Sequence, residues 1–136
     1  MSLEQIVTEA AKVGAAIEGI KQVYERVPEG ISAVPNLLVT VRSGTIAYEP
    51  DCLRWDHRLQ LWLRVLRTDL PTAENMARPF VAKVVEAFGK NTRLNDTCEA
   101  CWIANYEMMH MPFGAVPYFG VHFDLLVLEK EVWEFV

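Results

Sequence analysis

The sequence of 136 residues is poor in cysteine and in basic residues, and it has no long apolar run. Its three cysteines, Cys52, Cys98 and Cys101, are few and odd in number, which argues against a disulfide scaffold. Such sparse use of cysteine fits a reducing compartment. The 13 basic residues are outnumbered by 18 acidic ones. A broad duplex-binding face is therefore not expected, because lysine and arginine make the phosphate contacts. No apolar run approaches the ~20 residues that cross a bilayer, so we expect no membrane partner.

Sequence motifs that would specify a reaction are also missing. The chain has no glycine-rich phosphate loop, no dinucleotide fingerprint and no nucleophile elbow. Its first residues lack the basic and apolar regions of a secretory signal. We therefore predict that the chain is not an enzyme and that it uses no cofactor and no metal.

What the sequence does have is the composition of a globular domain. Apolar residues make up 51% of the chain and charged residues 23%, which excludes a disordered protein. A length of 136 residues suits one domain and can bury a core without disulfides or metal. We predict a single domain over residues 1–136, in which the apolar C-terminal tail at 129–136 docks on a neighbouring surface.

Two segments have the periodicity of amphipathic helices. Apolar residues at spacings of three and four predict helices over 3–25 and 69–88. Pro79 lies inside the second segment, so a bend or an interrupted helix is expected there. The inner stripe of this helix is predicted to comprise Met76, Phe80, Val81, Val84, Val85 and Phe88.

Strands are indicated by alternation of apolar and polar residues. It is clearest at 57–66 and 117–129, and shorter or weaker β-type runs occur at 37–41, 45–48 and 95–109. Ser43-Gly44 is interpreted as a hairpin turn. The order is helix, three strands, helix, two strands. It predicts an α+β fold with a single mainly antiparallel sheet of about five strands and two helices packed on one face.

Cys98 and Cys101 form a C-x-x-C pattern, which can hold a metal or a redox pair when both sulfurs lie on one side. On a strand, a separation of three residues places the side chains on opposite faces. No second C-x-x-C and no paired histidines follow at zinc-finger spacing. We therefore interpret the two cysteines as incidental.

The methionine-rich segment at 108–111 contains thioether and imidazole groups that suit copper. Such flexible side chains are more often core filler or an adaptable contact surface. We favour a contact surface or a core edge for this segment.

Two groups of acidic and histidine side chains are candidates for chemistry. The first group lies just before and at the start of the clearest strand, and it could contribute to a metal site or an acid–base pair. The simpler interpretation is that its residues end a turn and begin a strand. The second lies on one face of the last strand, where a structural hydrogen-bonded pair is favoured over a catalytic dyad because no nucleophile motif accompanies it. The first group is Asp51, Cys52, Asp56 and His57, and the second is His122 and Asp124.

Several of these features together resemble the tail-terminator (tail-completion) proteins of long-tailed bacteriophages. The matching segments are the amphipathic first helix, the strand at 57–63, the helix through 81–85 and the closing strand at 118–127. The closing strand contains the aromatic-Gly-x-x-Phe pattern that begins at Phe119.

The resemblance implies a structural protein without catalytic residues. Such proteins form a ring, commonly a hexamer, that caps the completed tail tube and joins it to the head connector. The implied partners are copies of the chain itself, the tail tube and the head connector proteins, while DNA passes through the lumen without sequence-specific binding. The implied location is the virion, after assembly in the host cytoplasm.

Contact surfaces are predicted where apolar side chains lie next to turn signals, because loops carry much of protein binding. We predict contacts from the loop at 50–55, the segment at 109–113 and the tail at 133–135. The candidate residues are Cys52, Arg54, Trp55, Met109, Met111, Phe113, Trp133 and Phe135.

The sequence leaves two alternatives open. One is a small ligand-binding domain or enzyme with a pocket lined by His57, His122 and Asp124. The other is a phage head-completion adaptor with the same fold, since fold alone does not separate these functions.

Overall fold

The described part of the chain forms one five-stranded sheet and two helices. The computed structural model describes residues 3–31, 33–67 and 70–132. In chain order the elements are α1 (Leu3–Ala15), β1 (Gln22–Tyr24), β2 (Asn36–Tyr48), β3 (Cys52–Arg67), α2 (Leu70–Gly89), β4 (Ala100–His110) and β5 (Tyr118–Val132). The predicted α+β class is confirmed.

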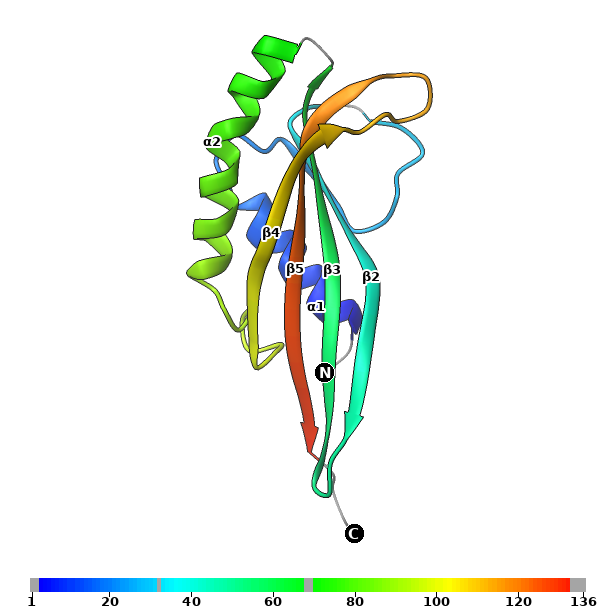
Figure 1. The fold of residues 1–136 in the computed structure, drawn as a ribbon, viewed down its shortest axis with the longest axis vertical. Helices are drawn as coiled ribbons and strands as arrows, with labels where there is room; N and C mark the ends of the chain where they lie inside the picture. The colour runs from blue at the N-terminus through cyan, green and yellow to red at the C-terminus, as the bar shows by residue number, and fades with distance from the viewer. Residues whose placement is uncertain (1–2, 32, 68–69, 133–136) are drawn as a thin grey trace.

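The strand order across the sheet is β1-β2-β3-β5-β4. Only β1 pairs in parallel, with β2, and every other pairing is antiparallel. Figure 1 shows α1 crossing behind the strands and α2 lying beside β4. One buried cluster joins both helices to the same side of the sheet. We call this side the helix face and the opposite side, which no described helix covers, the open face.

The core rests on the alternation of β3 and β5. In each strand every second side chain points to the helix face, as the alternation of apolar and polar residues in the sequence predicts. The inward residues of one strand lie opposite those of the other and are fully buried: Leu59 against Leu125, Leu61 against Phe123 and Leu63 against Val121.

Small residues let the helices approach this layer closely. Gly14 of α1 lies against the side chain of Leu37 in β2, where an added Cβ would overlap it. Ala73 and Ala77 of α2 are fully buried, and Phe80 and Phe88 extend from the same helix face into the core.

The first predicted helix is too long. α1 ends at Ala15 rather than at residue 25, and residues 22–24 form β1, which pairs with residues 36–38 of β2. Between these elements Gly19 has a φ of 97°, which glycine adopts without strain and which does not belong to a right-handed helix.

The predicted hairpin turn at Ser43-Gly44 is also wrong. β2 runs straight through it, with a register shift at Arg42, and the turn lies at residues 49–51. β3 therefore begins at Cys52 instead of His57. A turn at Ser43-Gly44 would forfeit the pairing of residues 43–48 with residues 53–58, which the longer strands retain.

α2 is continuous from Leu70 to Gly89 although Pro79 lies inside it. Pro79 is exposed, so the carbonyl that it leaves without a donor can be solvated. The predicted inner stripe is wrong at Met76 and Val85, which are exposed, because the buried side runs through the alanines at 73 and 77.

The strand predicted over 95–109 begins later, at Ala100. Leu94, Asn95 and Asp96 have φ values of 45°, 54° and 66°, which belong to turns and not to strands. At the other end of the chain β5 extends to Val132, so residues 129–132 of the predicted tail belong to the sheet. The candidate contacts Trp133 and Phe135 lie outside the described residues.

Gly120 gives a direct test of the packing between β5 and β3. A Cβ at this position would overlap the carbonyl oxygen of Leu63 on the neighbouring strand. We expect Gly120→Ala to lower the free energy of unfolding by about 3 kcal/mol in urea denaturation, because backbone atoms cannot move aside as a side chain can.

Gly30→Ala is the matched control, since nothing lies within 4 Å of its added Cβ. It should leave the free energy of unfolding within about 0.5 kcal/mol of the parent value. Equal stability of the two variants would contradict this account of the β3–β5 contact.

Candidate functional site

The far end of the β2–β3 hairpin carries three of the predicted contact residues. Cys52 is fully buried, Trp55 is half-buried and Arg54 is exposed. These residues belong to β3 and not to a loop, so only residues 49–51 form the turn. Cys52 offers no surface to a partner, while Arg54 forms a 3.7 Å ion pair with Glu49 across the turn.

The same turn brings together Glu49, Asp51 and Cys52, whose ligand atoms lie within 4.8 Å of one another. The Cys52 thiol donates a hydrogen bond to Glu49 Oε2 at 3.2 Å. Burial, and then this bond to Glu49, raise the pKa of the Cys52 thiol and oppose the thiolate that a metal would need. Asp56 and His57, which the sequence grouped with Asp51 and Cys52, lie further along β3 with side chains on opposite faces.

The segment from Met109 to Phe113 folds back onto its own sheet. Met111 is buried, and its carbonyl accepts a 3.3 Å hydrogen bond from Arg64 Nε. The Arg64 guanidinium lies over the Phe113 ring, 5.4 Å from its centroid, and burial lowers its pKa. Met111 is therefore part of the core, whereas Met109 and Phe113 are half-buried.

The methionines of β4 do not converge as copper ligands. Met108 packs toward the core from the helix face, while Met109 pairs with Gly120 on the open face. His110 is exposed and contacts the Phe119 ring edge-on at 5.6 Å.

The two cysteines of the C-x-x-C pattern lie on the same side, against the prediction from strand geometry. Cys98 precedes β4, so strand alternation does not apply to the pair. The Cys98 thiol donates a 3.8 Å hydrogen bond to the carbonyl of Thr92, and the Cys101 thiol donates a 3.7 Å hydrogen bond to the carbonyl of Asn91. Burial raises the pKa of the Cys101 thiol to about 12, so the pair is protonated and unreactive at neutral pH.

His57 has a partner that sequence proximity could not reveal. Its Nε2 lies 3.4 Å from Glu129 Oε1, 72 residues away, and both side chains are only 7% exposed. The β3–β5 register makes this contact, and the Trp55 ring stacks on His57 at 5.7 Å. The sequence does contain a signal for the burial of Glu129. Glu129 is two residues after the buried Val127 on β5, so both side chains point to the helix face. Glu129 Oε2 and Trp55 Nε1 have no hydrogen-bond partner among the described residues.

His122 and Asp124 share the open face, as predicted, but do not form a hydrogen bond. Nε2 and Oδ1 are 3.9 Å apart, and neither atom has a partner in the described part of the chain. The Trp62 ring packs on His122 at 4.4 Å and donates a 2.9 Å hydrogen bond to Thr40.

The two histidines cannot serve one pocket. His122 lies opposite Trp62 on β5 and β3, and Trp62 is five residues from His57 along β3. An odd separation on a strand places side chains on opposite faces, so the sheet itself separates His57 from His122 and Asp124.

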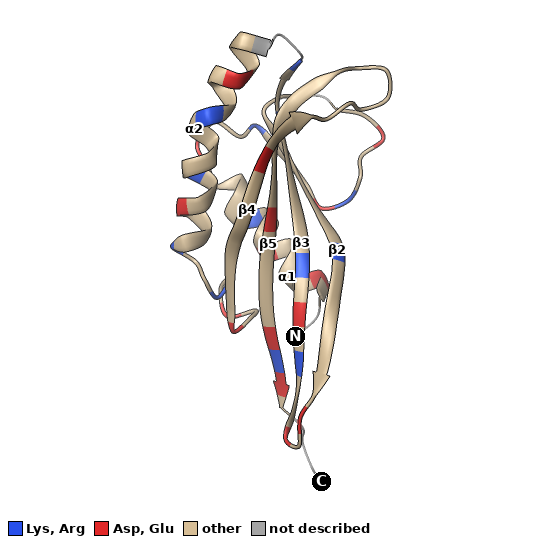
Figure 2. Cartoon of the chain, in the orientation of Figure 1, with Lys and Arg blue, Asp and Glu red and all other residues tan. Residues whose placement is uncertain are grey.

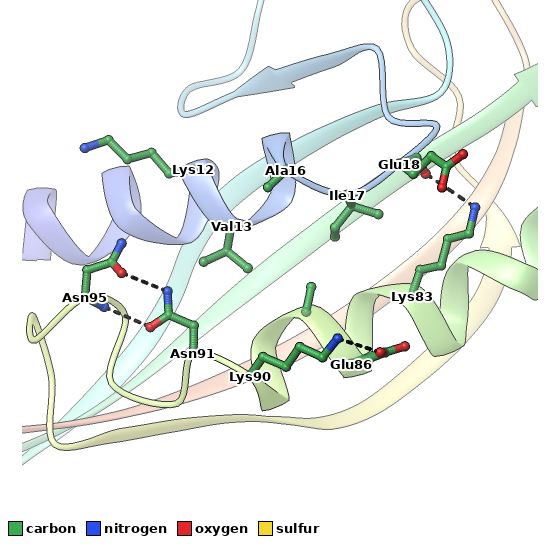
Figure 3. A pocket seen from close by; sticks show the side chains of 11 residues that line it. Lys12, Val13, Ala16, Ile17, Glu18, Lys83, Glu86, Lys90, Asn91 and Asn95 are labelled. Atoms are coloured by element: carbon green, nitrogen blue, oxygen red, sulfur yellow. Dashed lines mark hydrogen bonds and ion pairs between the residues drawn. The ribbon is translucent and has the colours of Figure 1, made fainter.

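The groove between α1 and α2, of about 610 Å³, is lined by several charged side chains, and some of them bond to other protein groups (Figure 3). Lys83 Nζ donates to the carbonyl of Glu18 at 3.4 Å, and Lys90 pairs with Glu86 at 2.8 Å. At one end Asn91 and Asn95 hydrogen bond to each other. Lys83, Lys90 and Glu86 are therefore engaged with other protein groups in this groove.

A second hollow of about 560 Å³ lies on the open face, between residues 43–45 of β2 and Trp102 of β4. Leu126 and Leu128 form its apolar floor, and Asp56 and Arg58 lie among its walls. It provides apolar contact area beside two charges of opposite sign.

Large exposed apolar side chains gather on the strands. Most of those in the described chain lie on β2, β4 and the end of β5, and none of them is among the contact residues predicted from the sequence. They are Val41, Ile46, Tyr48, Trp102, Tyr106 and Val132.

Comparison with protein-family models and with curated protein sequences finds no match to this chain. None of the described helices has the length and apolar character needed to cross a membrane.

The thiol chemistry can be tested by labelling the native protein with a maleimide at pH 7. All three cysteines are buried and their pKa values are raised, so the reactive thiolate is scarce. We expect labelling at least ~100-fold slower than in the urea-unfolded chain. Rapid native labelling at Cys98 or Cys101 would contradict the assignment of these residues to the core.

Proposed function

We propose that the chain is a structural assembly protein that forms a ring, caps a phage tail tube and joins it to the head connector. The observation that carries the proposal is the exposure of large apolar side chains, Ile46, Tyr48 and Tyr106 among them, along the strands of a single sheet. Exposed apolar area of this kind marks a protein contact surface.

A ring of identical subunits needs two different contact surfaces on each copy, which meet head to tail. Five of the large exposed apolar residues in the described chain fall on β2 toward one side of the sheet or on β4 at the other: Val41, Ile46, Tyr48, Trp102 and Tyr106. The fold class is also the one that the resemblance to tail-terminator proteins implies. The net charge of −5 would let DNA pass a ring without adhering. The proposed location is the virion, after assembly in the host cytoplasm.

The arrangement of the ionisable groups supports this structural function over the alternative of a small enzyme or ligand-binding domain. A catalytic or ligand-binding pocket would require His57, His122 and Asp124 to converge. The β3–β5 register places the first on the helix face and the other two on the open face.

Deletion of the coding sequence from its phage genome tests the proposal. Without a cap and joint, filled heads and unattached tails should accumulate, and infectious particles should fall by orders of magnitude. Electron microscopy of the lysate measures the first outcome and plaque counts measure the second. Expression of the chain from a plasmid should restore both, and normal tailed particles without the gene would contradict the proposal.

Complementation with a conservative variant separates the structural role from the catalytic rival. His122→Gln and Asp124→Asn preserve shape and remove the ionisable groups, so the double variant should restore plaque counts to within about threefold of the parent. Circular dichroism confirms that the variant is folded. A folded variant that fails to complement would favour a catalytic or ligand-binding role for this pair.

A further inference from the structure

The outer edge of β2 is bare over most of its length. β1 pairs only with residues 36–38, and no described strand pairs with the outer side of residues 39–48. Every side chain from 41 to 48 is exposed, on both faces. Such an edge presents unpaired backbone N–H and C=O groups, which can pair with another strand.

β4 forms the other edge of the sheet, and no described strand pairs with its outer side, although α2 lies beside it (Figure 1). It pairs only with β5, and all of residues 102–107 except Ile103 are exposed. At its start the N–H of Cys101 donates to the carbonyl of Thr92 at 2.6 Å, so the free stretch begins after this residue.

Neither edge carries lysine or proline, two residues that commonly prevent association. Soluble proteins protect long edges with lysine, proline or short strands. Residues 41–48 and 100–110 contain no lysine and no proline. Each edge has one register shift, at Arg42 in β2 and at Ala104 in β4, and each exposes large apolar side chains.

The two edges carry opposite charge. Arg42 is the only charged residue in 41–48, and Glu107 is the only Asp, Glu, Lys or Arg in 100–110. Figure 2 shows these as a single blue band on β2 and a single red band on β4. Neither has an ion-pair partner in the described ranges. This complementarity favours a β2–β4 contact over β2–β2 or β4–β4 contacts, which would place like charges together.

The direction of the strands also suits a β2–β4 contact. β2, β3, β5 and β4 alternate in direction, so β2 and β4 run in opposite directions. Copies placed side by side in the same orientation therefore bring β4 of one against β2 of the next in antiparallel pairing. A contact between two unlike edges is head to tail and can close into a ring.

We propose that copies of this chain join edge to edge, with residues 43–48 of one copy pairing antiparallel with residues 102–107 of the next. The inference rests on the proposed function, because it supplies the contact by which the ring forms. It makes the sheet continuous from copy to copy and covers Ile46, Tyr48 and Tyr106 with apolar neighbours.

Strand tilt accounts for the offset between the paired segments. Within one copy, Thr45 of β2 pairs with Asp56 of β3, which pairs with Leu128 of β5, which pairs with Ala100 of β4. Thr45 and Ala100 therefore lie at the same level of the sheet. Four strands spaced ~4.8 Å apart and tilted by ~35° in a closed ring shift successive copies by ~13 Å, or about four residues. Ala104 is unpaired at the register shift of β4, so four paired positions beyond Ala100 is Asn105. The shift therefore brings Thr45 opposite Asn105, and both side chains lie on the open face.

Lysine substitutions on the two edges test the contact by sedimentation velocity over a range of concentrations. Ile46→Lys and Tyr106→Lys should each raise the concentration of half-assembly by about tenfold or more, equivalent to ~1.4 kcal/mol. Val85→Lys is the matched control, since Val85 on α2 is 45% exposed and Ile46 is 48% exposed. It should assemble as the parent does. A parent chain that stays monomeric, or edge variants that assemble like the control, would overturn the proposal.

Cross-linking identifies which edges meet. Thr45→Cys and Asn105→Cys are made as separate variants, and each is treated with a short bis-maleimide alone and after mixing. The mixture should give a cross-linked dimer, while each variant alone should stay at the background of the parent, whose three cysteines are buried. Cross-linking of one variant with itself would overturn the head-to-tail contact.

The outcome is distinguishable from that of the proposed function. If deletion of the gene abolishes head–tail joining but the edge variants and cross-links fail, the ring forms through another surface. If the edge contact is found but deletion leaves normal tailed particles, the chain self-associates for another purpose.

Discussion

The register between β3 and β5 is the constraint on which the rest of the structure depends. These strands pair from Cys52 opposite Val132 to Arg67 opposite Tyr118, with one irregularity beside Arg64. A shift of one residue would move the leucines of β3 to the open face and bring polar neighbours into the core. Burial of the inward side chains therefore fixes the pairing, and both helices pack on the layer that results.

This register also decides what the chain can do with its ionisable groups. It buries His57 against Glu129 on the helix face and leaves His122 with Trp62 on the other side of the sheet. Because the sheet stands between them, these groups stay in separate environments. The opposite charges of Arg42 and Glu107 lie on β2, whose outer side is unpaired beyond residue 38 among the described residues, and on the outer strand β4. The features free to act are therefore at the edges of the sheet.

The sequence predicts the strongly periodic parts of this fold well. The alternation in β3 and β5 identified the buried residues, such as Leu61 and Phe123, because a period of two over many residues fits a strand with one buried face and does not fit a helix. Prediction failed where local preference and long-range pairing compete. Ser43-Gly44 has the composition of a turn, yet the pairing of Gly44 with His57 keeps it in a strand.

Contact residues were harder to predict than the fold. Met111 and Cys52 were selected for their position near turns, and both are buried. Met111 lies in a segment that bonds to Arg64 of the sheet, and Cys52 belongs to β3, where it pairs with Val132 of β5. Exposure of Tyr106 could not be predicted, since it depends on β4 lying at the edge of the sheet, and strand order is not encoded in the periodicity of one strand.

Hydrogen–deuterium exchange of the full chain at increasing protein concentration tests the central claim, association of copies through the sheet edges, most directly. The account predicts that amides in residues 43–48 and 102–107 exchange more slowly as the chain assembles, while those at 23–29 do not change. Fast exchange of both edge segments in an assembled particle, or a mass that remains at 15.5 kDa at every concentration, would contradict it.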